Sequence, residues 1–212
     1  MIRLLIADDH AVVRRGLRQI VATTADLTVA AEASDGATVL AGVRAGNGDL
    51  LVMDMTMPGL CGVDLIRRVR SERPALPVLV LSMHNEAQVV ARALRAGAAG
   101  YVTKDCDPET LLAAMRKVAA GGRFIDPALV DTMVFDDAGA DGDAPPQSVL
   151  SDREFQVLQL LATGRSLNDI GERLNVSAKT VSTHKTRLMQ KLGIDNNAAL
   201  VRYAIRHGLL AE

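Results

Sequence analysis

Three acidic residues near the start of the chain stand where carboxylates can do chemistry. Asp8 and Asp9 directly follow the apolar run from Arg3 to Ala7, and Asp54 follows the run from Leu50 to Met53. Apolar runs this short are typical of strands that are buried on both faces, as in a parallel sheet. Ligands collect at the carboxyl ends of such strands. Taken alone, Asp54 would be an ordinary turn residue, because Asp is common before a Pro-Gly turn.

Two later apolar runs are followed by further reactive side chains. Ser82 follows the run that ends at Leu81, and Lys104 follows the run that ends at Val102. Neighbouring carboxylates raise each other's pKa, so a proton or a cation must balance their negative charge. Mg²⁺ suits this role, because it binds one or two carboxylates together with phosphate oxygens. A nucleophilic carboxylate, a metal position, an ammonium and a hydroxyl are the groups that phosphoryl transfer onto Asp54 requires.

Five apolar runs alternate with segments of helical period, and these elements would have to position the reactive residues. The expected strands are 3–7, 27–33, 49–53, 77–81 and 99–102, and the expected helices are 12–21, 36–45, 61–71, 86–96 and 108–119. This alternation predicts an α/β fold, a parallel sheet with helices on both faces. Short right-handed connections favour a flavodoxin-like sheet of five strands in the order 2-1-3-4-5, in which the first and third strands are neighbours.

The residues at these strand ends resemble the receiver domain of two-component response regulators. The pattern consists of Asp8-Asp9, Asp54 with Pro58 and Gly62 after it, Ser82, Tyr101 and Lys104, and the domain is expected to span residues 1–122. The resemblance implies that Asp54 is the phosphoacceptor and that Lys104 and Ser82 contact the phosphoryl oxygens. It implies a switch in which Tyr101 follows Ser82 inward. The implied ligands of Mg²⁺ are Asp8, Asp9, Asp54 and the backbone carbonyl of Thr56.

Each assignment has a simpler alternative. Asp8 could cap the helix that opens near His10, Ser82 could be a turn hydroxyl, and Tyr101 could be a half-buried strand aromatic. The rival function is a phosphatase or phosphotransferase that turns over through an aspartyl-phosphate at Asp54. Enzymes of the haloacid dehalogenase type need a second Asp two residues after the nucleophile, and Thr56 stands there. We therefore expect no enzymatic activity beyond Mg²⁺-dependent self-phosphorylation and dephosphorylation. A DNA-binding protein with a degenerate receiver is a third alternative, against which the complete residue set argues.

Composition and charge change after residue 122. Residues 1–134 carry 15 basic and 15 acidic side chains, residues 135–148 carry four Asp and no base, and residues 149–212 carry nine bases and six acids. We expect a short helical segment at 128–135 and an acidic Pro/Gly linker within 123–148. An alternative is that the acidic strip docks on the basic last segment. Only that last segment, 149–212, has the charge to approach nucleic acid phosphate.

Residues 149–212 are expected to form a small all-α domain of four helices. Ser151 and Glu154 form a capping-box pattern, Ser166 and Asp169 repeat it, and Ser177 begins a further helix that ends before Gly193. A last helix is expected over 196–207. Two helices joined by the short turn before Ser177 predict a helix-turn-helix.

The last segment resembles the LuxR-type DNA-binding domain. The pattern consists of Arg153-Glu154, Val157-Leu158, Ile170, Leu174, Val176-Ser177, Thr180-Val181, His184 and Lys191-Leu192-Gly193. In such domains the second helix of the motif meets base edges and phosphates. The expected DNA contacts are Lys179, Thr180, Ser182, Thr183, Lys185, Arg187 and Lys191. Ser182 stands where many relatives carry Lys, which removes one basic contact.

The two resemblances identify the chain as a response regulator of the NarL/FixJ type. They imply a transcription regulator in which a sensor histidine kinase or a small phosphodonor phosphorylates Asp54, with Mg²⁺ as cofactor. The added charge would promote a homodimer that binds paired half-sites on double-stranded DNA. Acids at positions 8 and 9 interrupt the first apolar run, and no run approaches 18 apolar residues. We therefore expect a cytoplasmic protein without a membrane partner.

Overall fold

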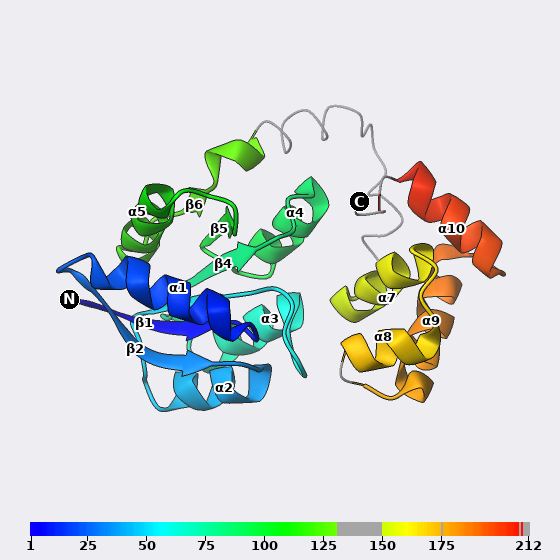
Figure 1. Ribbon diagram of the computed structural model, residues 1–212, viewed down its shortest axis with the longest axis horizontal. Coiled ribbons are helices and arrows are strands. Elements are labelled where there is room, and N and C mark those ends of the chain that lie inside the picture. Colours follow the sequence, from blue (N-terminus) through cyan, green and yellow to red (C-terminus); the bar gives the residue numbers. More distant parts are fainter. Residues whose placement is uncertain (131–149, 175, 208, 210–212) are drawn as a thin grey trace. The chain divides into compact units, whose positions relative to one another are not determined.

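The computed structural model describes residues 1–130, 150–174, 176–207 and 209, in two compact units that divide within residues 131–149 (Figure 1). The first unit alternates strands and helices, as its sequence predicts. Its elements are β1 (Ile2–Ala7), α1 (Ala11–Ala22), β2 (Leu27–Ala33), α2 (Gly36–Arg44), β3 (Leu50–Met53), α3 (Gly62–Glu72), β4 (Val78–Ser82), α4 (Ala87–Arg95), β5 (Gly100–Thr103), α5 (Pro108–Ala119) and β6 (Phe124–Ile125). Residues 127–130 are helical, whereas the rest of the predicted helical segment, the acidic linker and its docking alternative lie outside the described residues.

The strands form one parallel sheet in the order β2-β1-β3-β4-β5-β6. The predicted order of the first five strands is confirmed, but the predicted number of strands is wrong. The sixth strand pairs Phe124 with Gly100 and Ile125 with Tyr101 along the free edge of β5. The strand contains only the two residues Phe124 and Ile125. Two residues are too few to show an apolar period, so the sequence pattern does not reveal this strand.

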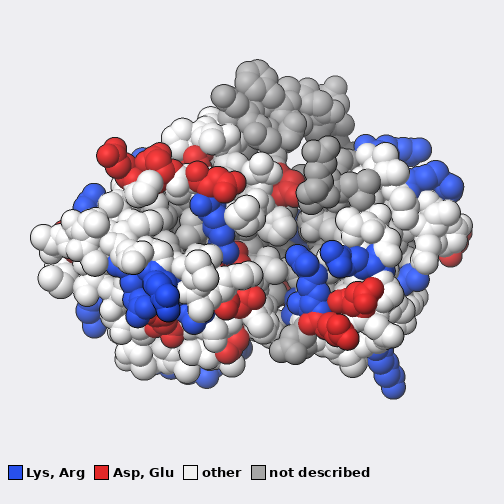
Figure 2. Space-filling view, viewed as in Figure 1, with Lys and Arg blue, Asp and Glu red and all other residues white. Residues whose placement is uncertain are grey.

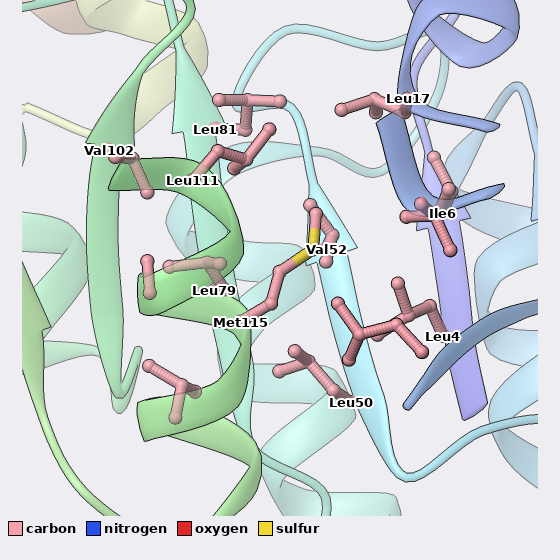
Figure 3. Packing of buried hydrophobic residues seen from close by; sticks show 14 residues of the cluster. Leu4, Ile6, Leu17, Leu50, Val52, Leu79, Leu81, Val102, Leu111 and Met115 are labelled. Carbon is pink, nitrogen blue, oxygen red and sulfur yellow. The ribbon is translucent and has the colours of Figure 1, made fainter. Parts of the chain in front are cut away.

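The core explains why the strand sequences are almost continuously apolar. Every second strand residue packs under α1 and α5, as Figure 3 shows for Leu4, Ile6, Leu50, Val52, Leu79, Leu81 and Val102 of the sheet with Leu17, Leu111 and Met115 of the helices. The residues between them point to the other face, where Leu5 packs against Gly42 of α2. Both faces are therefore covered, and the polar strand ends are left at one edge.

The described part of the second unit contains the four predicted helices: α7 (Asp152–Ala162), α8 (Leu167–Arg173), α9 (Ala178–Leu192) and α10 (Asn197–Arg206). Ser151 with Glu154 and Ser166 with Asp169 form reciprocal capping boxes. Gly193 ends α9 with a φ of 64°, a left-handed conformation that favours glycine. None of the described helices combines the length and the apolar character needed to cross a membrane.

Candidate functional site

Sheet register brings Asp8 and Asp54 side by side. Ala7 and Met53, the last residues of β1 and β3, are partners in the sheet, and the backbone N–H of Asp54 donates to the carbonyl oxygen of Ala7 at 2.8 Å. Asp8 and Asp54 are therefore each the first residue after the last paired position of two neighbouring strands. Asp8 is 1% exposed and Asp54 is 4% exposed, so both acids lie in a pocket rather than in a solvated turn.

Lys104 enters the same pocket from the end of β5. Its Nζ lies 2.7 Å from Oδ2 of Asp8 and 3.2 Å from Oδ2 of Asp54. The backbone N–H of Lys104 donates to the carbonyl oxygen of Ser82 at 2.9 Å, which fixes the start of the β5–α5 connection beside β4. Residues that are almost a hundred positions apart thus form one compact ion cluster.

The pocket shifts the titration of its own groups. Burial raises the pKa of Asp54, Lys104 opposes this shift, and the charge of Asp8 adds to it. Burial alone would lower the pKa of Lys104, but Asp54 and Asp8 together raise it, so its ammonium remains charged at neutral pH. The buried carboxylates therefore gain from any additional positive charge.

A cation has a suitable set of donors here. Asp8, Asp9, His10 and Asp54 each offer a ligand atom, and these four atoms all lie within 4.8 Å of one another. Three carboxylates against one ammonium leave negative charge uncompensated, and oxygen donors suit Mg²⁺. The sequence does not reveal that Nδ1 of His10 lies 2.8 Å from Oδ1 of Asp9 and 3.2 Å from Oδ1 of Asp8. The role of the Thr56 carbonyl stays a prediction.

Asp8 also binds the backbone just before α1, but it does not cap this helix, which has no side-chain cap. Its Oδ1 accepts a hydrogen bond of 2.8 Å from the backbone N–H of His10, the residue that precedes α1. The same carboxylate accepts the Lys104 ion pair through Oδ2. One oxygen of Asp8 thus holds the residue before the helix and the other holds Lys104, and neither acts as the helix cap of the simpler interpretation.

Ser82 and Tyr101 meet on the next strands. Both side chains are fully buried, so Tyr101 is not the half-buried aromatic of the simpler interpretation. The Ser82 hydroxyl accepts from the backbone N–H of His84 at 3.2 Å, and the Tyr101 hydroxyl donates to the carbonyl oxygen of His84 at 2.8 Å. Burial raises the pKa of Tyr101, which a hydrogen bond with Ser82 only partly offsets, so the phenol stays protonated. Both hydroxyls are thus tied to the segment between β4 and α4.

In the second unit, α9 presents a polar face with basic residues. The buried positions Val181 and Leu188 turn one side of the helix to the core, while Lys179, Thr180, Ser182, Thr183, Arg187 and Lys191 are exposed and Lys185 is half-buried. The Ser177 hydroxyl caps the helix by accepting from the backbone N–H of Thr180 at 3.1 Å. Figure 2 shows basic and acidic side chains interspersed on the visible face of each unit.

Lys191 differs from the other basic residues of α9. Its Nζ lies 2.7 Å from Oε2 of Glu154, which is 3% exposed and also accepts from the backbone N–H of Ser151 at 2.8 Å. Burial would raise the pKa of Glu154, but hydrogen bonds from Lys191 and Ser151 lower it overall. The ammonium that the sequence predicts as a DNA contact thus joins α9 to the start of α7. The two residues are 37 positions apart, so no local sequence pattern reveals this contact.

Comparison with known proteins agrees with this division into two units. Residues 4–116 match the family model of the response regulator receiver domain, and residues 148–204 match the model of the luxR family of bacterial regulatory proteins. Response regulator UvrY of Escherichia coli is 35% identical over 209 residues, which cover 99% of this chain and 96% of that protein. The oxygen regulatory protein NreC of Staphylococcus carnosus is 36% identical over 214 residues, covering 98% of this chain and 99% of that protein.

Solved structures of the response regulator RcsB from Salmonella have the same fold. One matches with a TM-score of 0.62 and 30% identity, covering 97% of this chain and 98% of the other. Another, RcsB bound to a promoter in the presence of the phosphomimetic BeF3⁻, matches with a TM-score of 0.61 and 29% identity, covering 95% and 97% of the two chains. With a receiver match over more than half its length and full-length relatives above 30% identity, this chain belongs to the NarL/FixJ-type response regulators, DNA-binding transcription regulators that are controlled by phosphorylation.

Proposed function

We propose that Asp54 is the residue that receives the phosphoryl group. The observation that carries this proposal is the position of Lys104, whose Nζ lies within 3.2 Å of oxygens of both Asp54 and Asp8. An ammonium held there is preorganised to neutralise a phosphoryl oxygen bonded to Asp54. Asp8 and Asp9 would hold Mg²⁺ together with Asp54 and the carbonyl of Thr56. The bound cation supplies compensation for the charge that develops on the transferring group.

In the transfer step, a carboxylate oxygen of Asp54 attacks phosphorus. The bond to the leaving group breaks, which is a P–N bond in a phosphohistidine of a sensor kinase or a P–O bond in an acyl phosphate. The leaving group keeps the electron pair: the histidine nitrogen takes up a proton, and an acyl phosphate releases its carboxylate. Asp54 gains the phosphoryl group and about one unit of negative charge. Hydrolysis of the resulting acyl phosphate returns Asp54 to its starting state.

The added charge has nearby groups that can respond to it. Lys104 can shift its ion pair from Asp8 towards the phosphoryl oxygens, and Ser82 can donate its hydroxyl to them. The Ser82 hydroxyl now accepts from His84, whose carbonyl in turn binds Tyr101. A rotation of Ser82 would therefore disturb the segment after β4. Tyr101 is already fully buried, so we assign it the role of holding this segment through the His84 carbonyl rather than that of moving inward. We assign the change in dimerisation to this segment and its surface.

The output is binding to double-stranded DNA through α9. Lys179, Lys185 and Arg187 are the residues that we assign to phosphate, while Thr180, Ser182 and Thr183 lie at the amino-terminal half of the helix, where a recognition helix reads bases. Lys191 is assigned mainly to the ion pair with Glu154. A two-fold dimer would place two such helices on half-sites about one turn of DNA apart.

The proposal is tested by measuring promoter DNA affinity at one fixed salt concentration, with and without a small phosphodonor and Mg²⁺. We expect the phosphodonor to increase dimerisation and affinity in the wild type. Asp54→Asn, which keeps the shape of the side chain but not its nucleophile, should not respond. A matched control is Asp64→Asn, which changes an exposed carboxylate of α3 and should respond as the wild type does. An Asp54→Asn protein that responds normally would contradict the proposal.

A further inference from the structure

Asp126, which follows the unpredicted strand β6, is a buried carboxylate with three hydrogen bonds. Its Oδ2 accepts from the backbone N–H of Thr103 at 3.1 Å and from the Thr103 hydroxyl at 2.8 Å. Its Oδ1 accepts from the backbone N–H of Ala128 at 3.0 Å. The residue is 4% exposed, so these bonds form away from competing water. A carboxylate buried in this way strongly restrains the groups that it binds.

The carboxylate takes the place of the next backbone acceptor in the sheet. The ladder between β5 and β6 ends where the N–H of Asp126 donates to the carbonyl oxygen of Tyr101 at 2.9 Å. One residue later the chain turns away at Pro127 into the helical residues 127–130. The N–H of Thr103 would then face an absent strand, and the Asp126 side chain accepts it instead.

This restraint acts next to the phosphoacceptor pocket. Thr103 is the sheet partner of Ser82, and the following N–H, that of Lys104, donates to the carbonyl oxygen of Ser82 at 2.9 Å. The two peptide units on either side of Thr103 are therefore held from opposite sides, one by Asp126 and the other by the Ser82 carbonyl of β4. Lys104 reaches two carboxylates from this point, so a small displacement of its backbone would change both ion pairs.

We propose that Asp126 is a positioning residue for Lys104, and that it ties the first turn after β6 to the strand that carries Lys104 and Tyr101. This inference rests on the proposed function of the pocket. Because the coupling is reciprocal, a ligand that fixes Lys104 should also steady the turn that begins at Ala128, where the chain leaves the sheet. Residues 123–130 would thus belong to the part of the receiver that responds to phosphorylation. They do so although they follow α5, the last helix of the alternating strands and helices.

The test uses the full-length chain and beryllofluoride with Mg²⁺ as the probe of the pocket. Asp126→Asn keeps one oxygen acceptor but cannot serve both Thr103 and Ala128. We expect it to lower beryllofluoride affinity about tenfold, the factor that corresponds to one weakened hydrogen bond to a charged group. Hydrogen exchange gives a second readout: beryllofluoride should slow exchange at Ala128 and Leu129 in the wild type but not in Asp126→Asn.

A matched control separates positioning from general stability. Asp35 accepts from the backbone N–H of Thr38 at 2.8 Å and from its hydroxyl at 3.1 Å, after the opposite edge strand of the sheet. Asp35→Ala, which removes this helix cap, should lower the melting temperature while leaving beryllofluoride affinity unchanged. Equal loss of affinity in Asp35→Ala and Asp126→Asn would show that both act through stability and would overturn the inference.

Two substitutions of Thr103 keep the test decisive if Asp126→Asn does not fold. Thr103→Val has nearly the same shape but lacks the hydroxyl, and should lower beryllofluoride affinity, whereas Thr103→Ser keeps the hydroxyl and should bind as the wild type does. If Asp126→Asn folds, wild-type beryllofluoride affinity in both Asp126→Asn and Thr103→Val would overturn the inference. If Asp126→Asn does not fold, wild-type affinity in Thr103→Val would overturn it. Either result leaves the proposed function standing. A wild-type chain that binds no beryllofluoride would instead refute the proposed function, and the inference with it.

Discussion

The hydroxyl of Tyr101 donates a hydrogen bond of 2.8 Å to the backbone carbonyl oxygen of His84. Because Tyr101 is fully buried, water does not replace this bond when it is lost. We expect Tyr101→Phe to lower the free energy of unfolding by about 1 kcal/mol. The same change should reduce the gain in DNA affinity caused by phosphodonor, since residue 101 would no longer be hydrogen-bonded to the segment after β4. Urea unfolding and DNA titration measure the two effects, and an unchanged gain would remove Tyr101 from the switch.

A second prediction concerns the compensation of buried charge by Lys104. Lys104→Met should destabilise the receiver by about 3 kcal/mol in the absence of divalent cations, because Asp8 and Asp54 are left without their ammonium. Mg²⁺ should restore part of this loss, since a cation at the carboxylates replaces the missing charge. Thermal unfolding with Mg²⁺ and with a chelator checks both statements. Lys117→Met, at an exposed site on α5, should change stability by no more than about 1 kcal/mol under either condition.

The third prediction is the pH dependence of stability that Asp54 causes. Burial raises the pKa of Asp54 in the folded protein above the ordinary value of 3.8. The folded state therefore binds the proton more tightly, and the stability that this contributes is present below about pH 3.8 and is lost as pH rises through the raised pKa. Asp54→Asn does not titrate, so without metal its stability relative to the wild type should increase over that pH window and then stay constant. Denaturant unfolding across acidic to neutral pH measures this, and a difference that is flat with pH would contradict the assigned shift.

The fourth prediction separates two lysines of α9. Lys191→Met should lower the unfolding free energy of the second unit by about 1–2 kcal/mol, because buried Glu154 loses its partner. Lys179→Met should leave stability within about 0.5 kcal/mol but reduce the slope of log affinity against log salt by about 1. Urea unfolding and DNA titration at several salt concentrations compare the two variants. The opposite pattern would mean that Lys191 binds phosphate and Lys179 supports the fold.

Much of the receiver was predictable because parallel strands share one polarity. Once the apolar runs are interpreted as parallel strands, Asp8, Asp54, Ser82 and Lys104 must follow the same edge of the sheet. The order of the first five strands follows from the short, right-handed connections. The helix caps at Ser151, Ser166 and Ser177 were equally accessible, because capping is local in sequence.

The contacts between elements could not be predicted in the same way. The sixth strand has only two residues and exists because the edge of β5 offers backbone groups to pair with. The pairing of Lys191 with Glu154, and of Asp126 with Thr103, joins positions far apart in sequence. The apolar periodicity of a sequence does not indicate which polar side chains come into contact, since each such contact depends on distances set by packing.

The sequence by itself therefore determined the kinds of element, the edge at which reactive groups gather, and the basic character of α9. These properties depend on apolar period, strand polarity and composition, which the chain carries locally. Only the tertiary structure decided that Lys104 bridges Asp8 and Asp54, that His10 faces the acidic pair, and that Asp126 is buried against β5. The reason is that charges and hydrogen bonds act over a few ångströms, and folding alone sets which groups come that close.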